Sequence, residues 1–388
     1  MKMRCIACAV LSGMILFAAA SAFAQGDNRS RSDAPVNLSG RIYFQWYKTL
    51  ATPDQDENVN SFELTRAYIT LDRVMAGGFS VLVTLDAGND NGAKDTRYQN
   101  FLKFAYGQYA GDLGFGLVTL RSGLIPNPIT SFIDGESDYR WIMNSFIERS
   151  AYLLYSDVSN GLSIDYTADL GVGMNLALGS MLALDLQVVN GDGYRKTDES
   201  GDTAGIDDGK AYLAMLTYRP IQHLYLAGYF RYQTMLDHAY ETDNYRTYAG
   251  VTVMYVTGII RCGASLVAAR ASSKAATALP DVDPQLRSYL LGDLFANINL
   301  FPVIGRPLLV AARVSAGQTS FESDTIAGAG DGDTATVFVY AAGIGWQFNE
   351  YYRLMAYYED RDSTSGDIAA LDWGRHERIF YIKSEIRF

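Results

Sequence analysis

Apolar and polar residues alternate with a period of two along most of this chain, the pattern of β-strands that have one apolar and one polar face. In the stretch VNLSGRIYFQWYKTL, Phe44 and Trp46 belong to the apolar side, whereas Arg41 and Tyr43 belong to the other side. Amphipathic helical periodicity is almost absent, so an all-β fold is expected. After this first strand, the pattern predicts strands near 62–73, 79–86, 99–109, 114–121, 160–171, 181–190, 210–220, 223–235, 245–257, 259–270, 285–300, 307–319, 335–348, 351–361 and 378–388.

Long polar connections and tight turns alternate between these predicted strands. The long connections lie near 51–61, 87–98, 191–209, 236–244, 271–284, 320–334 and 362–377. The tight turns lie at 76–78, 111–113, 221–222, 257–258 and 349–350. Outer-membrane β-barrels have this rhythm because their periplasmic turns are short and their outer loops are long. The chain is therefore predicted to be a transmembrane, antiparallel, up-and-down β-barrel.

The region between Arg121 and Leu182 contains two candidate strands, SAYLLYSD and NGLSIDYTADLG, and counting both gives an odd total of seventeen. Bacterial single-chain barrels have an even number of strands. We therefore assign NGLSIDYTADLG to the barrel wall and place 122–160 in one long third loop. The prediction is a barrel of sixteen strands.

The two sides of the strands must face different surroundings. In a bilayer every backbone polar group has to be paired within the protein, so the apolar side is expected to face lipid and the polar side the lumen. The closed barrel requires the last strand, which ends at Phe388, to pair with the first. A final strand that ends on an aromatic residue also resembles the signal recognised by the barrel-assembly machinery of the outer membrane.

The N-terminal residues 1–24 have the features of a secretory signal peptide. Lys2 and Arg4 precede an apolar run from about 6 to 20, and the small-residue site Ala22-Phe23-Ala24 follows. The run is shorter than the ~20 residues of a transmembrane helix. Cleavage after residue 24 would leave a polar periplasmic lead at 25–36 and a barrel at 37–388. The formal charge would change from −11 to −13, because two basic residues leave.

Four short motifs give the sequence a resemblance to the bacterial general porins and, more narrowly, to the phosphate-selective porin O/P family. They are LRSGLIPNPITSF (120–132), FIERS (146–150), LDLQVVNGDGY (184–194) and YLAMLTYRP (212–220). The resemblance implies a homotrimer in which each barrel has its own pore, and a third loop that folds inward to narrow it. Two features of the sequence agree with that loop. Pro126 and Pro128 disfavour strand pairing, and 139–146 is too apolar to lie in water.

Selectivity in such a pore depends on its diameter and on the charges that line it. The basic residues expected to line the pore are Arg41, Arg66, Arg121, Arg231, Arg261, Arg313 and Arg353. The charged residues expected in the constriction loop are Asp134, Glu136, Asp138, Arg140, Glu148 and Arg149. Two hypotheses stay open: the arginines attract anions, because guanidinium binds oxyanions well, or they pair with loop carboxylates and hold the loop in place.

The function predicted from these features is passive diffusion of small hydrophilic solutes or inorganic anions across the outer membrane, with a mild anion preference. The alternatives are a channel specific for phosphate, a sugar or a dicarboxylate, and a surface-binding adhesin barrel. An enzyme is not expected, because the three histidines, His223, His238 and His376, lack a matching nucleophile or metal-ligand spacing. No cofactor, metal or nucleic acid is predicted, and the remaining partners expected are membrane lipid and lipopolysaccharide.

Overall fold

The computed structural model describes residues 35–51, 59–89, 98–147, 166–191, 193, 210–237, 242–273, 285–300, 307–321, 334–365 and 376–388. The predicted signal peptide at 1–24 and nearly all of the predicted lead, 25–34, lie outside these residues.

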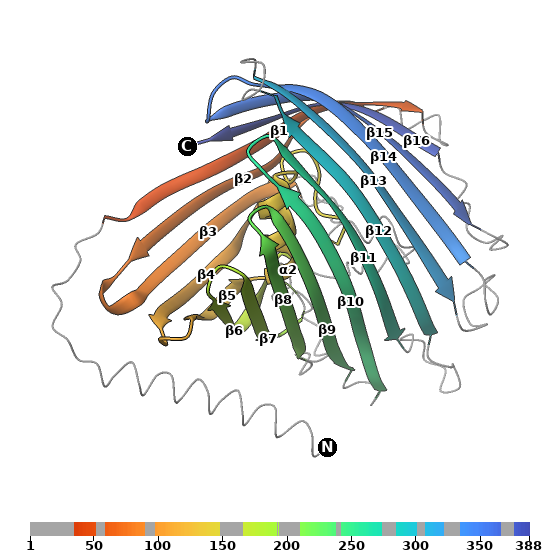
Figure 1. Ribbon diagram of the computed structural model, residues 1–388. Helices are drawn as coiled ribbons and strands as arrows, with labels where there is room; N and C mark the ends of the chain where they lie inside the picture. Colours follow the sequence, from red (N-terminus) through yellow and green to blue (C-terminus); the bar gives the residue numbers. More distant parts are fainter. Residues whose placement is uncertain are drawn as a thin grey trace.

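The described residues form sixteen β-strands that close into one barrel (Figure 1). Each strand pairs antiparallel with its neighbours in sequence, and β16 pairs with β1, where Ile42 lies opposite Ile386. The predicted sixteen-stranded up-and-down barrel is confirmed. The strands are β1 (Asn37–Ala51), β2 (Asn60–Val74), β3 (Phe79–Asn89), β4 (Tyr98–Asp112), β5 (Leu117–Pro126), β6 (Ala168–Leu178), β7 (Leu182–Val189), β8 (Ala211–Ile221), β9 (Leu224–Asp237), β10 (Thr242–Val256), β11 (Ile260–Ser273), β12 (Gln285–Asn299), β13 (Leu308–Phe321), β14 (Thr334–Gln347), β15 (Tyr352–Ser365) and β16 (His376–Arg387).

The apolar sides of the strands lie on the outside of the barrel. In β1, Leu38 and Phe44 are exposed, whereas Tyr43, which has the opposite parity, is only 4% exposed. In β16, Ile382 and Ile386 are exposed, whereas Glu385, which points to the opposite side of the strand, is fully buried. A soluble protein would bury the apolar side instead, so the expected outward orientation of the Phe44 side is confirmed.

The position of the sixth strand differs from the prediction. β6 begins at Ala168 and pairs with β5, which continues to Pro126, so the third connection spans 127–167 rather than 122–160. Pro126 is tolerated because it is the last residue of its strand. The alternation in β6 is obscured by Gly171, where the β7 backbone approaches closely, and by Gly173, which the side chains of Gln187 and Ile125 cover. The other candidate, SAYLLYSD, lies outside the described residues.

The third connection contains helix α2 (Pro128–Ser137), which lies within the ring of strands and contacts β10 and β11 (Figure 1). Asn127 caps its N-terminus, because its Oδ1 accepts hydrogen bonds from the backbone N–H groups of Ile129 and Thr130. Pro128 suits the first helical position, where no hydrogen-bond donor is needed. Helix α2 ends at Ser137, and the next residue, Asp138, adopts the left-handed conformation with φ of 53°.

A short 3₁₀ turn, η2 (Ala76–Gly78), joins β2 to β3. None of the helices in the described part of the chain is long and apolar enough to cross a lipid bilayer.

Candidate functional site

Residues 127–147, which we call the inner segment, pack against inward-facing side chains of the barrel wall. The apolar residues of the inner segment that are buried in this contact are Ile129, Ile133, Tyr139, Trp141, Ile142, Met143, Phe146 and Ile147. Their cluster extends from β8 through β16 to β1 and includes Tyr43, Leu213, Met215, Tyr248, Val267, Leu291, Phe295, Leu309, Val339, Met355 and Tyr357. This side of the interior therefore contains a packed apolar core in addition to the polar residues of the wall.

The sequence pattern contained a signal for this core that the prediction of a polar lumen did not use. In strands such as β12 and β13, apolar residues occur on both parities, so Leu291 and Leu309 face inward although the outward parity is also apolar. A strand wall that is apolar on both sides is expected only where something covers its inner face.

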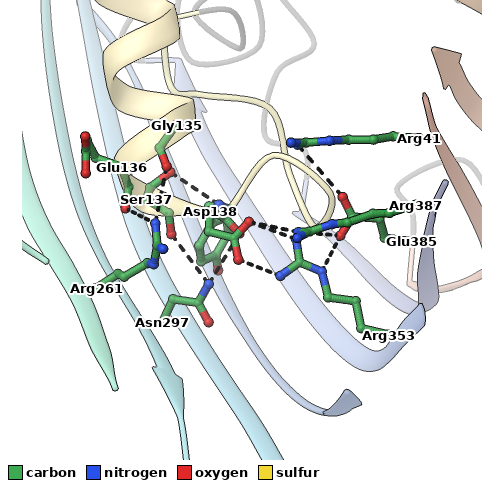
Figure 2. A network of polar contacts seen from close by, with 11 residues as sticks. Arg41, Gly135, Glu136, Ser137, Asp138, Arg261, Asn297, Arg353, Glu385 and Arg387 are labelled. Carbon is green, nitrogen blue, oxygen red and sulfur yellow. Dashed lines mark hydrogen bonds and ion pairs between the residues drawn. The ribbon is translucent and has the colours of Figure 1, made fainter. Parts of the chain in front are cut away.

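The C-terminal end of α2 is held by a network of polar contacts with the wall (Figure 2). Arg261 Nη1 donates hydrogen bonds to the carbonyl oxygens of Gly135, at 3.2 Å, and Glu136, at 2.9 Å. Asn297 Nδ2 lies 3.5 Å from the carbonyl oxygen of Ser137 and 3.4 Å from that of Asp138. The last carbonyls of a helix lack partners within the helix and carry partial negative charge, so a guanidinium there stabilises the helix end.

Asp138 is the central carboxylate of this network (Figure 2). Arg353 binds it through two hydrogen bonds, at 2.6 and 2.9 Å, and Arg387 lies 3.4 Å away. Burial by itself raises the pKa of the Asp138 carboxyl, but the hydrogen bonds and positive charge of Arg353, with the charges of Arg387 and Arg261, outweigh it. The pKa of Asp138 therefore lies below its ordinary value, and the carboxylate stays charged at neutral pH.

Arg353 also connects the inner segment to two further groups. Its Nε donates to Glu385 of β16, and its guanidinium lies 4.3 Å from the ring centre of Trp141. Arg313, on β13, has a similar role. Its Nε donates to Asp293 at 2.7 Å, and its Nη1 donates to the carbonyl oxygen of Asn144 at 2.8 Å. Three of the seven predicted pore-lining arginines, Arg261, Arg313 and Arg353, thus contact the inner segment. This favours the hypothesis that lumen arginines hold the loop in place.

The other four predicted arginines contact the wall itself. Arg66 pairs with Asp86 at 3.0 Å, and Arg121 Nε donates to Gln108 at 2.8 Å. Arg231 is buried, and its Nη2 donates hydrogen bonds to the carbonyl oxygen of Gly191 and to Oε1 of Gln233, which lies on the same face of β9. Arg41 lies 4.0 Å from Glu385, and its side chain is 53% exposed.

Of the predicted loop residues, Arg140 pairs with Asp134 at 2.9 Å, and Glu136 contributes its backbone carbonyl to the network. Glu148 and Arg149 lie outside the described residues.

A cavity of about 550 Å³ lies between the inner segment and the wall strands β1 to β4 and β16. We call it the candidate cavity. Four cations line it, Arg41, Lys103, Arg140 and Arg387, against one carboxylate, Asp134. Its other lining residues are Ser39, Gly40, Tyr43, Tyr68, Thr70, Thr84, Phe104, Thr130, Ser131, Gly135, Thr167 and Phe388.

Lys103 is the cation that the sequence pattern did not identify. The register between β3 and β4 pairs Thr84 with Phe104 and Leu85 with Leu102, so Lys103 is the extra residue of a β-bulge. Its Nζ donates to the Tyr68 hydroxyl at 3.0 Å and lies 4.4 Å from the centre of that ring. A bulge shifts the parity of a strand, so strict alternation assigns the residues beyond it to the wrong side.

The fold of this chain is similar to that of several solved porin and outer-membrane channel structures. No protein-family model matches the chain, and no curated protein is similar to it in sequence. Among solved structures, an anion-selective porin from Comamonas acidovorans matches 92% of this chain and 100% of its own, with a TM-score of 0.61 and 11% identity. The outer membrane channel DcaP of Acinetobacter baumannii matches 93% and 99%, with a TM-score of 0.62 and 12% identity. OmpT of Vibrio cholerae matches 92% and 99%, with a TM-score of 0.58 and 12% identity. At this identity the similarity is one of fold: a sixteen-stranded barrel of the bacterial outer-membrane porin type.

Proposed function

We propose that the protein is an outer-membrane porin that lets small hydrophilic solutes diffuse passively, with a mild preference for anions. The observation that carries the proposal is the candidate cavity, in which four cations face one carboxylate inside a closed barrel. Positive charge along a narrow passage lowers the electrostatic barrier for anions and raises it for cations. The inner segment acts as the constriction, because it occupies the side of the lumen next to β8 to β16 and leaves the passage beside β1 to β4.

The exterior of the barrel supports the outer membrane as the location. Exposed apolar side chains cover strand after strand, including Phe62, Val251 and Ile344. Such a surface would aggregate in water but is what a barrel presents to lipid. Two of the solved structures that share the fold are named as outer-membrane proteins, and a third is named as an anion-selective porin.

A phosphate-specific channel, which the O/P-family resemblance suggests, has less support. Phosphate selectivity would need several arginines available to the solute, but Arg261, Arg313 and Arg353 bind the inner segment or wall carboxylates. The homotrimer, the signal peptide, the lipopolysaccharide contact, recognition of the Phe388 strand by assembly machinery and the lack of enzymatic activity stay predictions.

Planar-bilayer recording of the purified protein in a KCl gradient tests the proposal. We expect stepwise conductance and a reversal potential displaced toward that of chloride. Arg41→Gln should bring the reversal potential closer to zero, because Arg41 lines the cavity and its side chain is 53% exposed. Arg73→Gln, which removes the same charge from an exposed position outside the cavity lining, is the matched control. A cation-selective channel, or a barrel without conductance, would refute the proposal.

A further inference from the structure

The candidate cavity has the features of a binding site and not only of a passage. Its volume of about 550 Å³ lies within the range of ~300–1,000 Å³ that is usual for small-molecule sites. Charged, hydroxyl and aromatic groups converge on it from five strands and from the inner segment. An unselective passage needs only an open cross-section, whereas groups of these three kinds together can recognise one class of solute.

Two of the cations are positioned before any solute arrives. Lys103 is held by the Tyr68 hydroxyl and ring, and Arg140, which also interacts with the Tyr68 hydroxyl, is held by Asp134. Fixed cations lose little conformational entropy when an oxyanion binds, and their hydrogen bonds to a carboxylate are charge-assisted. Arg41 and Arg387, which lie 4.0 and 2.9 Å from Glu385, complete the four cations that line the cavity.

Thr167 supplies an independent observation. Its side chain is only 6% exposed and lines the cavity, yet its Oγ1 has no hydrogen-bond partner among the described residues. Buried hydroxyl groups are nearly always hydrogen-bonded, so one left over at a cavity wall indicates that a bound molecule completes it. Ser131, an exposed residue of α2, adds a second hydroxyl to the lining.

Aromatic rings form another part of the wall. The rings of Tyr43 and Tyr68 lie edge to face with their centres 5.7 Å apart, and Phe104 follows on β4. Such rings pack against the C–H groups of a solute, a contact that inorganic phosphate cannot make. A solute that uses all three kinds of group has a carboxylate, several hydroxyls and a short carbon chain or ring.

We propose, on the basis of the channel function above, that the candidate cavity is a binding site for small hydroxylated carboxylates, the sugar-acid class. The carboxylate binds Lys103 and Arg41, a hydroxyl of the solute binds Thr167, and the carbon chain lies against Tyr43 and Tyr68.

The test is block of the KCl current through the full-length protein in planar bilayers by sodium gluconate, with sodium acetate, sodium benzoate and sodium phosphate at equal ionic strength. Gluconate should block in a concentration-dependent way and at a lower concentration than the other three salts. Lys103→Met should raise its half-blocking concentration about tenfold, because it removes one of the two cations that bind the carboxylate. Thr167→Val should raise it several-fold for gluconate and leave the effect of acetate unchanged, because acetate has no hydroxyl.

The matched controls are Lys48→Met, at an exposed position of β1, and Thr217→Val on β8, neither of which lines the cavity. A heat-dependent shift in gel mobility confirms that each variant is folded. Stronger block by phosphate or by benzoate would overturn the sugar-acid assignment, and so would block by gluconate that is unchanged in both cavity variants. A KCl current in the same recordings would still support the channel function. Without a KCl current the channel function fails instead. Calorimetric titration of gluconate into the detergent-solubilised protein then decides the binding site, which the lack of any heat of binding would overturn.

Discussion

Replacing Asp138 by Asn asks whether ion pairs or apolar packing hold the inner segment. The substitution keeps the shape of the side chain and removes the charge that receives two hydrogen bonds from Arg353. Removing one partner of a buried ion pair costs about 3–5 kcal/mol when the other charge is left alone. Here Arg353 keeps Glu385, and the Asp138 side chain is 31% exposed, so we expect a loss of about 2–3 kcal/mol in the free energy of unfolding.

Apolar packing should outweigh that loss. Eight apolar side chains of the inner segment are buried, among them Ile129, Ile142 and Phe146, each less than 2% exposed. Burial of one such side chain contributes about 1.5–3 kcal/mol, and even after allowance for a compact unfolded state the sum is on the order of 10 kcal/mol. The inner segment of Asp138→Asn should therefore stay docked, and the single-channel conductance should not change.

Two measurements on the same variant separate these effects. Urea unfolding in lipid vesicles, followed by tryptophan fluorescence, gives the change in stability, and bilayer recording gives the conductance. Glu136→Gln is the control, because it removes a charge from the same helix and its carboxylate has no hydrogen bond or ion pair with another described residue. A clear rise in conductance for Asp138→Asn would contradict this prediction, since it would mean that the ion pairs, and not the apolar core, keep the lumen partly filled.

Three further predictions follow from the same contacts. Because the pKa of folded Asp138 lies below its ordinary value of 3.8, its contribution is complete above about pH 5 and is lost as the pH falls through the ordinary value and then the folded pKa. The stability difference between wild type and Asp138→Asn, from urea unfolding, should thus be constant from about pH 7 to pH 5 and shrink in stronger acid. Gly40→Ala should destabilise barrel closure by about 1–3 kcal/mol, because the new Cβ would lie 2.2 Å from the Phe388 ring. A smaller folded fraction on unheated gels would show this loss. Gly228→Ala is the control and should have no effect, because there is open space around Gly228. Arg313→Met leaves the buried Asp293 carboxylate without its cation and should cost about 3–5 kcal/mol in urea unfolding, whereas adding Asp293→Leu should restore most of the loss.

The part of the structure that could be predicted is the part governed by local periodicity. Phe44 faces outward and Tyr43 inward because adjacent residues of a strand point to opposite sides, and the alternation of long and short connections accounts for the up-and-down order of the strands. The inward parity of residues such as Arg313 and Arg353 followed from the same rule.

The errors lie where local periodicity is interrupted. Gly171 and Gly173 have no side chains to alternate, so the sixth strand was predicted eight residues too early, at 160 instead of 168. The β-bulge at Lys103 changes the parity within β4, so a cation of the candidate cavity was missed. Both features depend on how a strand pairs with its neighbours, which one strand's own sequence does not contain.

A two-residue repeat and the lengths of the connections are local properties, and together with the even strand number of bacterial barrels they predict a sixteen-stranded cylinder with an apolar exterior. The roles of the charged residues depend instead on tertiary contacts. Whether Arg353 meets a solute or Asp138 depends on contacts between residues more than two hundred positions apart, and the residue pairs of that interior exist only once the barrel has closed around the inner segment.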